Sequence, residues 1–172
     1  MTTYAQPEKP TTTIANRVLK KYHTALVKAG VVLDLLMAHA DTNEEGQATG
    51  DAITRDGVRV GGVASIVGPK HRAQGLGDAL LLLDGDAWET MKEAEQEALI
   101  DHLLARIELK SDREGAVLTD DENRPKLKLR PWGYVMKGYR EVAKRHGAAS
   151  VEEKAACDFQ LSFDWEATTE AA

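Results

Sequence analysis

The feature that most constrains the fold is the apolar run at residues 79–84, ALLLLD, which follows a glycine-rich polar segment. Such a short, continuously apolar run is typical of a strand covered on both faces, because an exposed face would place polar residues at alternate positions. Residues 31–38, VVLDLLMA, have a similar pattern, and residues 58–67 alternate weakly around two glycines. The sequence therefore predicts a small sheet with at least one interior strand.

Helical periodicity appears on both sides of this run. Apolar residues recur at helical spacing before Gly30, which ends the pattern, and again after Trp88, which we expect to pack inward. The expected helices span residues 13–29, 86–91, 92–109, 134–145 and 150–157. Strands and helices in this combination predict an α+β fold: a small mixed β-sheet with helices packed against it.

Length and composition indicate one soluble domain, since the chain has 172 residues of which 42% are hydrophobic and 29% are charged. We expect this domain over residues 13–163, between a flexible N-terminal arm at 1–12 and an acidic flexible tail at 164–172. No apolar run has the length of a membrane span, the N-terminus lacks the apolar core of a signal peptide, and Cys157 is the only cysteine. These features favour the cytoplasm, and no membrane partner is expected.

The expected helix at 92–109 contains a motif with the frame of a zinc-binding helix. Such a helix reads H-E-x-x-H: two histidines one turn apart hold Zn²⁺, and the glutamate is the general base. Here His102 occupies the first ligand position, Leu103 stands where the base belongs, and Arg106 stands at the second ligand position. Leucine cannot accept a proton from water, and a guanidinium stays protonated without a free lone pair.

Four stretches carry a resemblance to a known family: GDALLLLDGDAWETM, ALIDHLLARIELK, TDDENRPKLKLR and EVAKRHGAASVE. On these stretches, the chain resembles the putative phage metallopeptidase family, small zincin-like proteins of phage and prophage genomes. The resemblance runs over residues 4–157. It implies a zincin-like fold, zinc as the cofactor of the family, and a bacterial host cell as the place where the protein acts.

The resemblance also implies which positions correspond to the family site. Typical members read DHEL-x-H on the helix, and KHD or PHD after a strand similar to KLKLR. His102 matches the first histidine; the glutamate falls on Leu103, the second histidine on Arg106, and the third histidine on Trp132. Two of the three metal ligands and the general base are therefore replaced, so the resemblance implies the fold without implying the activity.

No metal cofactor is expected, because a catalytic zinc site needs three protein ligands and His102 supplies one. One hypothesis is that Leu103 and Trp132 fill the emptied metal pocket, while Arg106 stacks on Trp132 or pairs with a carboxylate. The other is that Arg106 points to solvent and Trp132 belongs to an unrelated core.

A basic strand is a second candidate surface. The alternation of KLKLR places Lys126, Lys128 and Arg130 on one face. This face either blunts a sheet edge or forms a nucleic-acid groove with the basic residues at 137–145. The net charge of −6 argues against a generally basic nucleic-acid binder and leaves a local patch open. The segment at 68–78 lacks the order of a phosphate-binding loop and is expected to be a connector.

The sequence thus predicts a phage- or prophage-type pseudoenzyme that binds a protein or nucleic-acid partner. The expected surface is the former substrate cleft near His102, Arg106, Trp132 and the basic strand. In active zincins, an edge strand holds an extended peptide by backbone pairing, and that capacity does not need the metal. The alternative is a zinc-dependent peptidase or hydrolase with a non-standard metal site, built from His102 and carboxylates that the sequence does not assign.

Overall fold

The computed structural model describes residues 2–46, 48–55, 57–131 and 145–146. The chain divides into two compact units, Met1–Pro131 and Trp132–Ala172, and the helices and strands named below belong to the first. The tail at 164–172 and the helix expected at 150–157 lie outside the described residues, as does nearly all of the helix expected at 134–145. These remain predictions, and so does the single domain over residues 13–163.

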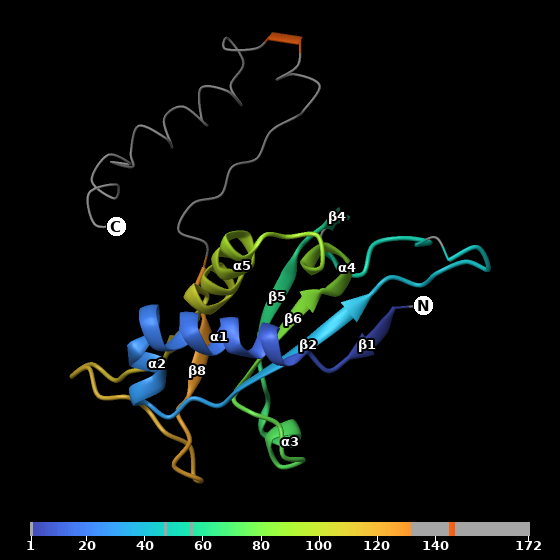
Figure 1. Ribbon diagram of the computed structural model, residues 1–172. Coiled ribbons are helices and arrows are strands. Elements are labelled where there is room, and N and C mark those ends of the chain that lie inside the picture. Colours follow the sequence, from blue (N-terminus) through green and yellow to red (C-terminus); the bar gives the residue numbers. More distant parts are fainter. Residues whose placement is uncertain (1, 47, 56, 132–144, 147–172) are drawn as a thin grey trace. The chain divides into compact units, whose positions relative to one another are not determined.

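A mixed four-stranded sheet forms the centre of the first unit (Figure 1). Its strand order is β1 (Thr3–Ala5), β2 (Leu33–His39), β6 (Ala79–Asp84) and β5 (Gly62–Ile66). β2 and β6 are parallel, whereas β1 and β5 run antiparallel to their neighbours. The apolar run at 79–84 is therefore an interior strand, as predicted, and its Leu81 and Leu83 are fully buried.

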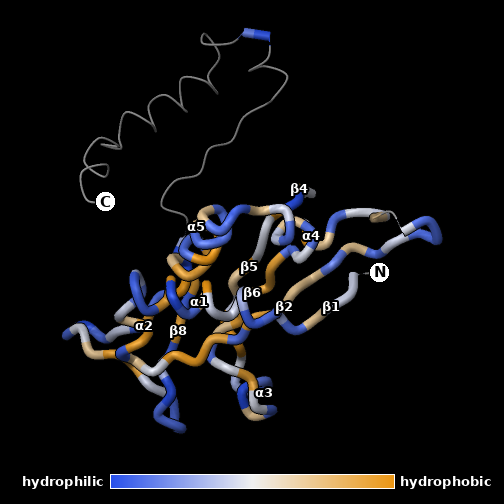
Figure 2. Tube along the Cα trace, viewed as in Figure 1, coloured by the Kyte–Doolittle hydropathy of each residue, from blue (hydrophilic) through white to orange (hydrophobic). Residues whose placement is uncertain are grey.

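Helices cover one face of the sheet and enclose the main core. These are α1 (Lys9–Tyr22), α2 (Thr24–Lys28), α4 (Gly85–Trp88) and α5 (Glu93–Ala105). Val18 of α1, Leu81 of β6 and Leu104 of α5 meet in this core, and Trp88 packs inward as predicted. Figure 2 shows the apolar trace of the central strands beneath α1. This arrangement confirms the α+β prediction. None of the described helices is long and apolar enough to cross a membrane.

The opposite face of the sheet carries a smaller apolar cluster. Ala38 of β2 packs there against Ala52 and Ile53 from the long excursion between β2 and β5. This excursion also holds a short hairpin of β3 (Thr54–Arg55) and β4 (Val58–Arg59). The expected connector at 68–78 contains one helical turn, α3 (Pro69–Arg72). The face away from the helices is thus covered only in part by described residues.

The N-terminal segment is more ordered than the sequence suggests. Residues 1–12 are expected to be a flexible arm, but β1 pairs with the end of β2 and α1 begins at Lys9. Proline in the first turn of a helix removes an N–H that has no intrahelical partner there, so Pro10 starts α1 instead of preventing it. The helix expected at 13–29 is interrupted at His23, whose backbone N–H caps α1.

The helix expected at 92–109 also ends early. α5 stops at Ala105, and β7 (Ile107–Leu109) pairs antiparallel with β8 (Leu127–Leu129). The apolar–Glu–apolar order of residues 107–109 has the two-residue period of a strand, which places both apolar side chains on one face. β8 itself is the alternating strand predicted around residues 126–130. Arg106 therefore lies at a helix end instead of inside a helix.

Candidate functional site

Helix α5 carries the positions that the sequence motif singles out. The Glu95 side chain accepts the backbone N–H of Lys92 at 2.7 Å, which satisfies one of the unpaired donors at the helix start. Arg17 of α1 forms ion pairs with Glu93 and Glu97. α5 is thus fixed at its first turns by its own cap and by contacts with α1.

Leu103, at the position of the expected general base, is buried. Its side chain is 2% exposed and belongs to the main core. It packs against β5 so closely that a Cβ added at Gly62 would lie 2.9 Å from Leu103 Cδ1 and 2.9 Å from the carbonyl oxygen of Leu82. Gly62 therefore provides the space that this leucine occupies beside the antiparallel edge strand of the sheet.

Arg106 is the residue that ends α5, and it is partly buried. Burial lowers the pKa of its guanidinium, and the positive charge of Arg55 lowers it further. Its carbonyl oxygen accepts the backbone N–H of Arg130 at 2.7 Å, which joins the end of α5 to the end of the basic strand. The structure therefore brings Arg106 and Arg130 together, two residues that the sequence analysis assigned to one surface. A guanidinium is not a zinc ligand.

His102 lies on the exposed side of α5, one position before the buried Leu103. The preceding residue, Asp101, has a role that sequence reasoning missed: its carboxylate pairs with His23 Nε2 at 2.7 Å. This contact ties the break between α1 and α2 to α5. No local sequence signal connects these two residues, which lie 78 positions apart.

The donor set around His102 does not fit a zinc ion. Leu103 has no donor atom, Arg106 is a cation, and the Asp101 carboxylate is engaged by His23. Within the part of the chain that the structure describes, no group of three or more His, Cys, Asp or Glu side chains is placed to hold a metal ion. Trp132, the position expected for the third family histidine, lies outside the described residues.

Comparison with known proteins decides the family. Residues 3–171 match the family described as putative phage metallopeptidase, which is nearly the whole chain. The chain belongs to the putative phage metallopeptidase family. No curated protein and no solved structure matched it.

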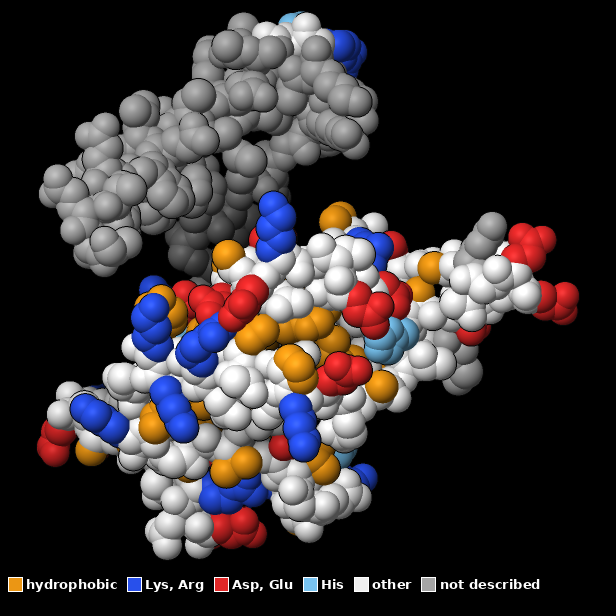
Figure 3. Space-filling model, in the orientation of Figure 1, with side chains coloured by type: hydrophobic (Ala, Val, Ile, Leu, Met, Phe, Trp, Pro, Cys, Tyr) orange, Lys and Arg blue, Asp and Glu red, His pale blue; other side chains and the backbone are white. Residues whose placement is uncertain are grey.

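In this family member, the basic strand is only partly available for a ligand. Lys126, Lys128 and Arg130 are exposed, as predicted for one face of an alternating strand. However, Lys128 Nζ lies 3.3 Å from the Glu108 carboxylate on β7. On the face seen in Figure 3, acidic side chains lie among the basic ones. The basic residues at 137–144 lie outside the described residues, so the nucleic-acid groove remains a prediction.

Arg130 also borders a pocket of about 400 Å³ between α2 and β7. His23 and Leu26 contribute from the helical side, and Ile107 and Glu108 from the strand. Glu108 contributes a carboxylate and Arg130 a guanidinium to its lining. Sequence reasoning missed it because its two walls come from segments far apart in the chain.

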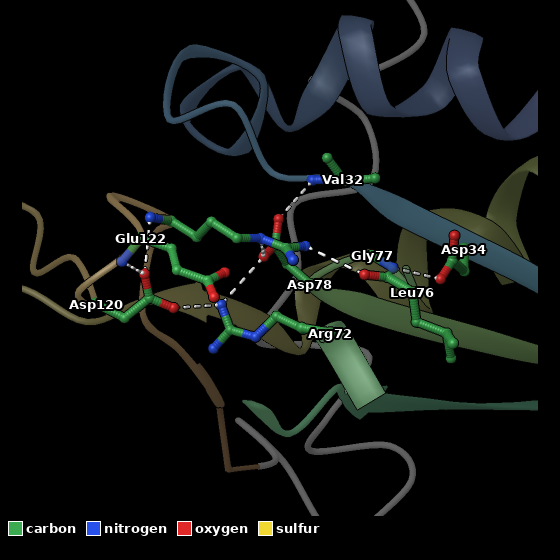
Figure 4. A network of polar contacts seen from close by, with 9 residues as sticks. Val32, Asp34, Arg72, Leu76, Gly77, Asp78, Asp120 and Glu122 are labelled. Atoms are coloured by element: carbon green, nitrogen blue, oxygen red, sulfur yellow. Dashed lines mark hydrogen bonds and ion pairs between the residues drawn. The ribbon is translucent and has the colours of Figure 1, made fainter. Parts of the chain in front are cut away.

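A buried polar network lies at the amino ends of β2 and β6 (Figure 4). Asp78 is 1% exposed and accepts hydrogen bonds from the backbone N–H of Val32 and from Arg72, with Arg124 Nε at 2.9 Å. Arg72 also donates to Asp120 at 2.9 Å. Backbone N–H groups of the Asp120 turn, together with Arg72 and Arg124, hold the pKa of Asp120 below its usual value. The network joins β2, α3 and the 110–125 segment.

A second set of carboxylates lies at the carboxyl ends of β2 and β6. Asp84 is fully buried, caps α4 through the Ala87 N–H, and receives two hydrogen bonds from Arg59 at 2.8 and 3.0 Å. Asp86 accepts the Ala40 N–H and contacts His39 Nδ1, each at 2.9 Å. The Ala40 N–H first, and His39 next, lower the pKa of Asp86. These groups fix the turn after β6.

Proposed function

We propose that this member of the putative phage metallopeptidase family is a pseudoenzyme that acts by binding a partner through the former substrate cleft. The observation that carries the proposal is the burial of Leu103 against Gly62, at the position of the general base. A buried hydrocarbon cannot deprotonate a metal-bound water, and no rotation of the side chain changes this.

The ligand positions support the same conclusion. His102 supplies one imidazole, whereas Arg106 adds a positive charge where a second neutral ligand is needed. The cofactor set of the family is therefore incomplete, and we propose that no catalytic zinc is held here. At the third expected ligand position the sequence has Trp132, whose indole is not a zinc ligand.

The sheet edge supports a binding role. β5 is an antiparallel edge strand of the four-stranded sheet and lies next to α5 through the contacts of Gly61 and Gly62 with Leu99 and Leu103. An edge strand can pair with an extended peptide through its backbone, independently of a metal. Because Lys128 is paired with Glu108 and the chain is acidic overall, a protein partner is favoured over nucleic acid. We place this activity in the cytoplasm of a bacterial host, from the phage family alone.

Elemental analysis and a peptidase assay on protein purified without chelator test the proposal. We expect substoichiometric zinc and no hydrolysis of a mixed peptide substrate. Stoichiometric, tightly held zinc together with hydrolysis abolished by a chelator would show that the protein is a zinc enzyme with a non-standard site.

Restoring the family residues tests the alignment of the site. The triple variant Leu103→Glu, Arg106→His, Trp132→His should gain zinc affinity, measured by calorimetric titration. Because a glutamate at position 103 can prevent folding, the double variant Arg106→His, Trp132→His serves as a second arm that leaves Leu103 intact and still supplies three imidazoles. If the folded double variant binds zinc no better than the original chain, positions 102, 106 and 132 do not converge on one site. The proposal is then wrong.

A further inference from the structure

On the edge of β2 that faces away from β6, described residues pair with only about half of the strand. β1 contacts β2 at Met37, Ala38 and His39, where Ala5, Tyr4 and Thr3 lie opposite. After Ala5 the chain leaves the sheet and enters α1 at Lys9. Among the described residues, no strand flanks the first half of β2 on this side, and Figure 1 shows β1 beside only its far end.

The backbone direction shows which groups are exposed by this gap. The backbone N–H and C=O of Val32 point toward β6, because its carbonyl oxygen accepts the backbone N–H of Asp78 at 2.7 Å. Successive residues of a strand direct their N–H and C=O groups to opposite edges. The backbone groups of Leu33 and Leu35 therefore point away from β6, toward the same edge at which Met37 and His39 pair with β1. Their backbone groups form an open edge that can pair with another strand.

A groove of about 510 Å³ lies over β2 and reaches this open edge. Its floor is β2 from Leu33 to Leu36. Gln6, Pro7 and Thr12 line the groove on the side of β1 and α1, and Gly75, Leu76 and Leu80 line it on the side of β6. Leu76 is 38% exposed and adds apolar surface to the groove.

Asp34 is the charged residue among those that line the groove. Its Oδ2 accepts the backbone N–H of Gly77 at 2.6 Å, and Figure 4 shows the carboxylate on β2 near the Leu76 segment. This bond fixes the carboxylate while its second oxygen still has acceptor capacity. A basic side chain placed opposite Asp34 would complement the charge.

We propose that this groove binds an extended peptide segment of a partner protein, which continues the line of β1 antiparallel to β2. The residues opposite Leu33, Leu35 and Leu36 are apolar, and the residue opposite Asp34 is basic. The backbone of the peptide pairs with Leu33 and Leu35, as in other cases of strand addition. The open edge of β2 faces away from β6 and β5, so this inference does not depend on the pseudoenzyme proposal.

The probe is an end-capped peptide of valine, valine, lysine and valine, added to the full-length protein and followed by NMR. We expect saturable shifts of the backbone amides of residues 33–36 and 76. N-methylation of the second and fourth residues removes the donors to β2, and each lost hydrogen bond should weaken binding about fivefold. N-methylation of the first and third residues, whose amides point away, is the matched control. No shifts, or equal effects of both methylated peptides, would overturn the proposal.

The variant Asp34→Asn tests the charge while keeping an acceptor for the Gly77 N–H. It should weaken the lysine peptide about two- to fivefold and leave a peptide with norleucine in place of lysine unchanged. Hydrogen exchange of the Leu33 and Leu35 amides identifies other occupants. We expect fast exchange at every protein concentration. Slow exchange at all concentrations would mean that the chain itself covers the edge, and slow exchange at high concentration alone would mean a second copy; either result overturns the proposal.

Discussion

Two buried positions of the first unit differ in the polar partners that surround them: one holds the carboxylate of Asp78, and the other holds the hydrocarbon side chain of Leu103. Asp78 is 1% exposed, and the Val32 N–H and two arginines surround its carboxylate. Leu103 is 2% exposed at the position where the sequence motif predicts a glutamate, and its neighbours there are Gly62 and core side chains. A buried charge persists where the fold supplies cations and N–H donors, and a hydrocarbon is favoured where those partners are missing.

The first prediction concerns Asp78 and has the largest expected effect. Asp78→Ala leaves the Arg72 and Arg124 guanidiniums with a missing partner and the Val32 N–H unsatisfied. We expect the free energy of unfolding to fall by about 3–5 kcal/mol, measured by urea denaturation. Asp120→Ala is the comparison, because Asp120 contacts the same Arg72 from a more exposed position. An equal loss in both variants would mean that burial of Asp78 adds nothing.

The second prediction concerns Leu103, the apolar position of the comparison. Leu103→Ala removes buried hydrocarbon from the main core and should lower the free energy of unfolding by about 3 kcal/mol. Leu99→Ala, at a partly buried position of the same helix, should cost less. If Leu103→Ala were neutral by urea denaturation, Leu103 would not be filling the position assigned to it beside β5.

Gly62 gives a smaller and more local test of the same packing. Gly62→Ala places a Cβ 2.9 Å from Leu103 Cδ1 and from the Leu82 carbonyl oxygen, which is shorter than a normal contact. Overpacking of this kind should lower the free energy of unfolding by about 1–3 kcal/mol. Gly50→Ala is the matched control, since nothing lies within 4 Å of its added Cβ. Thermal melts of both variants measure the difference, and a neutral Gly62→Ala would contradict close packing here.

The smallest effect is expected from Asp86 and depends on pH. The Ala40 N–H and His39 lower the pKa of Asp86 from 3.8, so its ionised form is stabilised in the folded state. Its contribution is complete above 3.8 and is lost as the pH falls through the lower folded value. In Asp86→Asn, urea midpoints should fall less steeply below pH 3.8 than in the original chain. An unchanged acid profile would assign the acid sensitivity to other carboxylates.

Local sequence patterns predicted the elements in which the order of apolar and polar residues along the chain matches their burial in the fold. The run ALLLLD gave an interior strand, KLKLR gave an alternating strand, and Trp88 packs inward from a short helix. Where a pattern was locally ambiguous, tertiary contacts decided. Residues 107–109 fit the end of a helix or a short strand, and pairing with β8 made them a strand. The prolines of residues 1–12 suggested a flexible arm, but pairing of β1 with β2 and a proline-tolerant helix start ordered them.

The sequence by itself determined the family, the α+β class and the side chains at His102, Leu103 and Arg106, because residue type and spacing are local information. Only the tertiary structure decided that Asp101 pairs with His23, that Asp78 meets Arg124, and that no described strand pairs with the first half of β2 on the edge away from β6. The physical reason is that a partner distant in the chain leaves no mark on local periodicity. Its position depends on how whole strands and helices pack, which no single segment encodes.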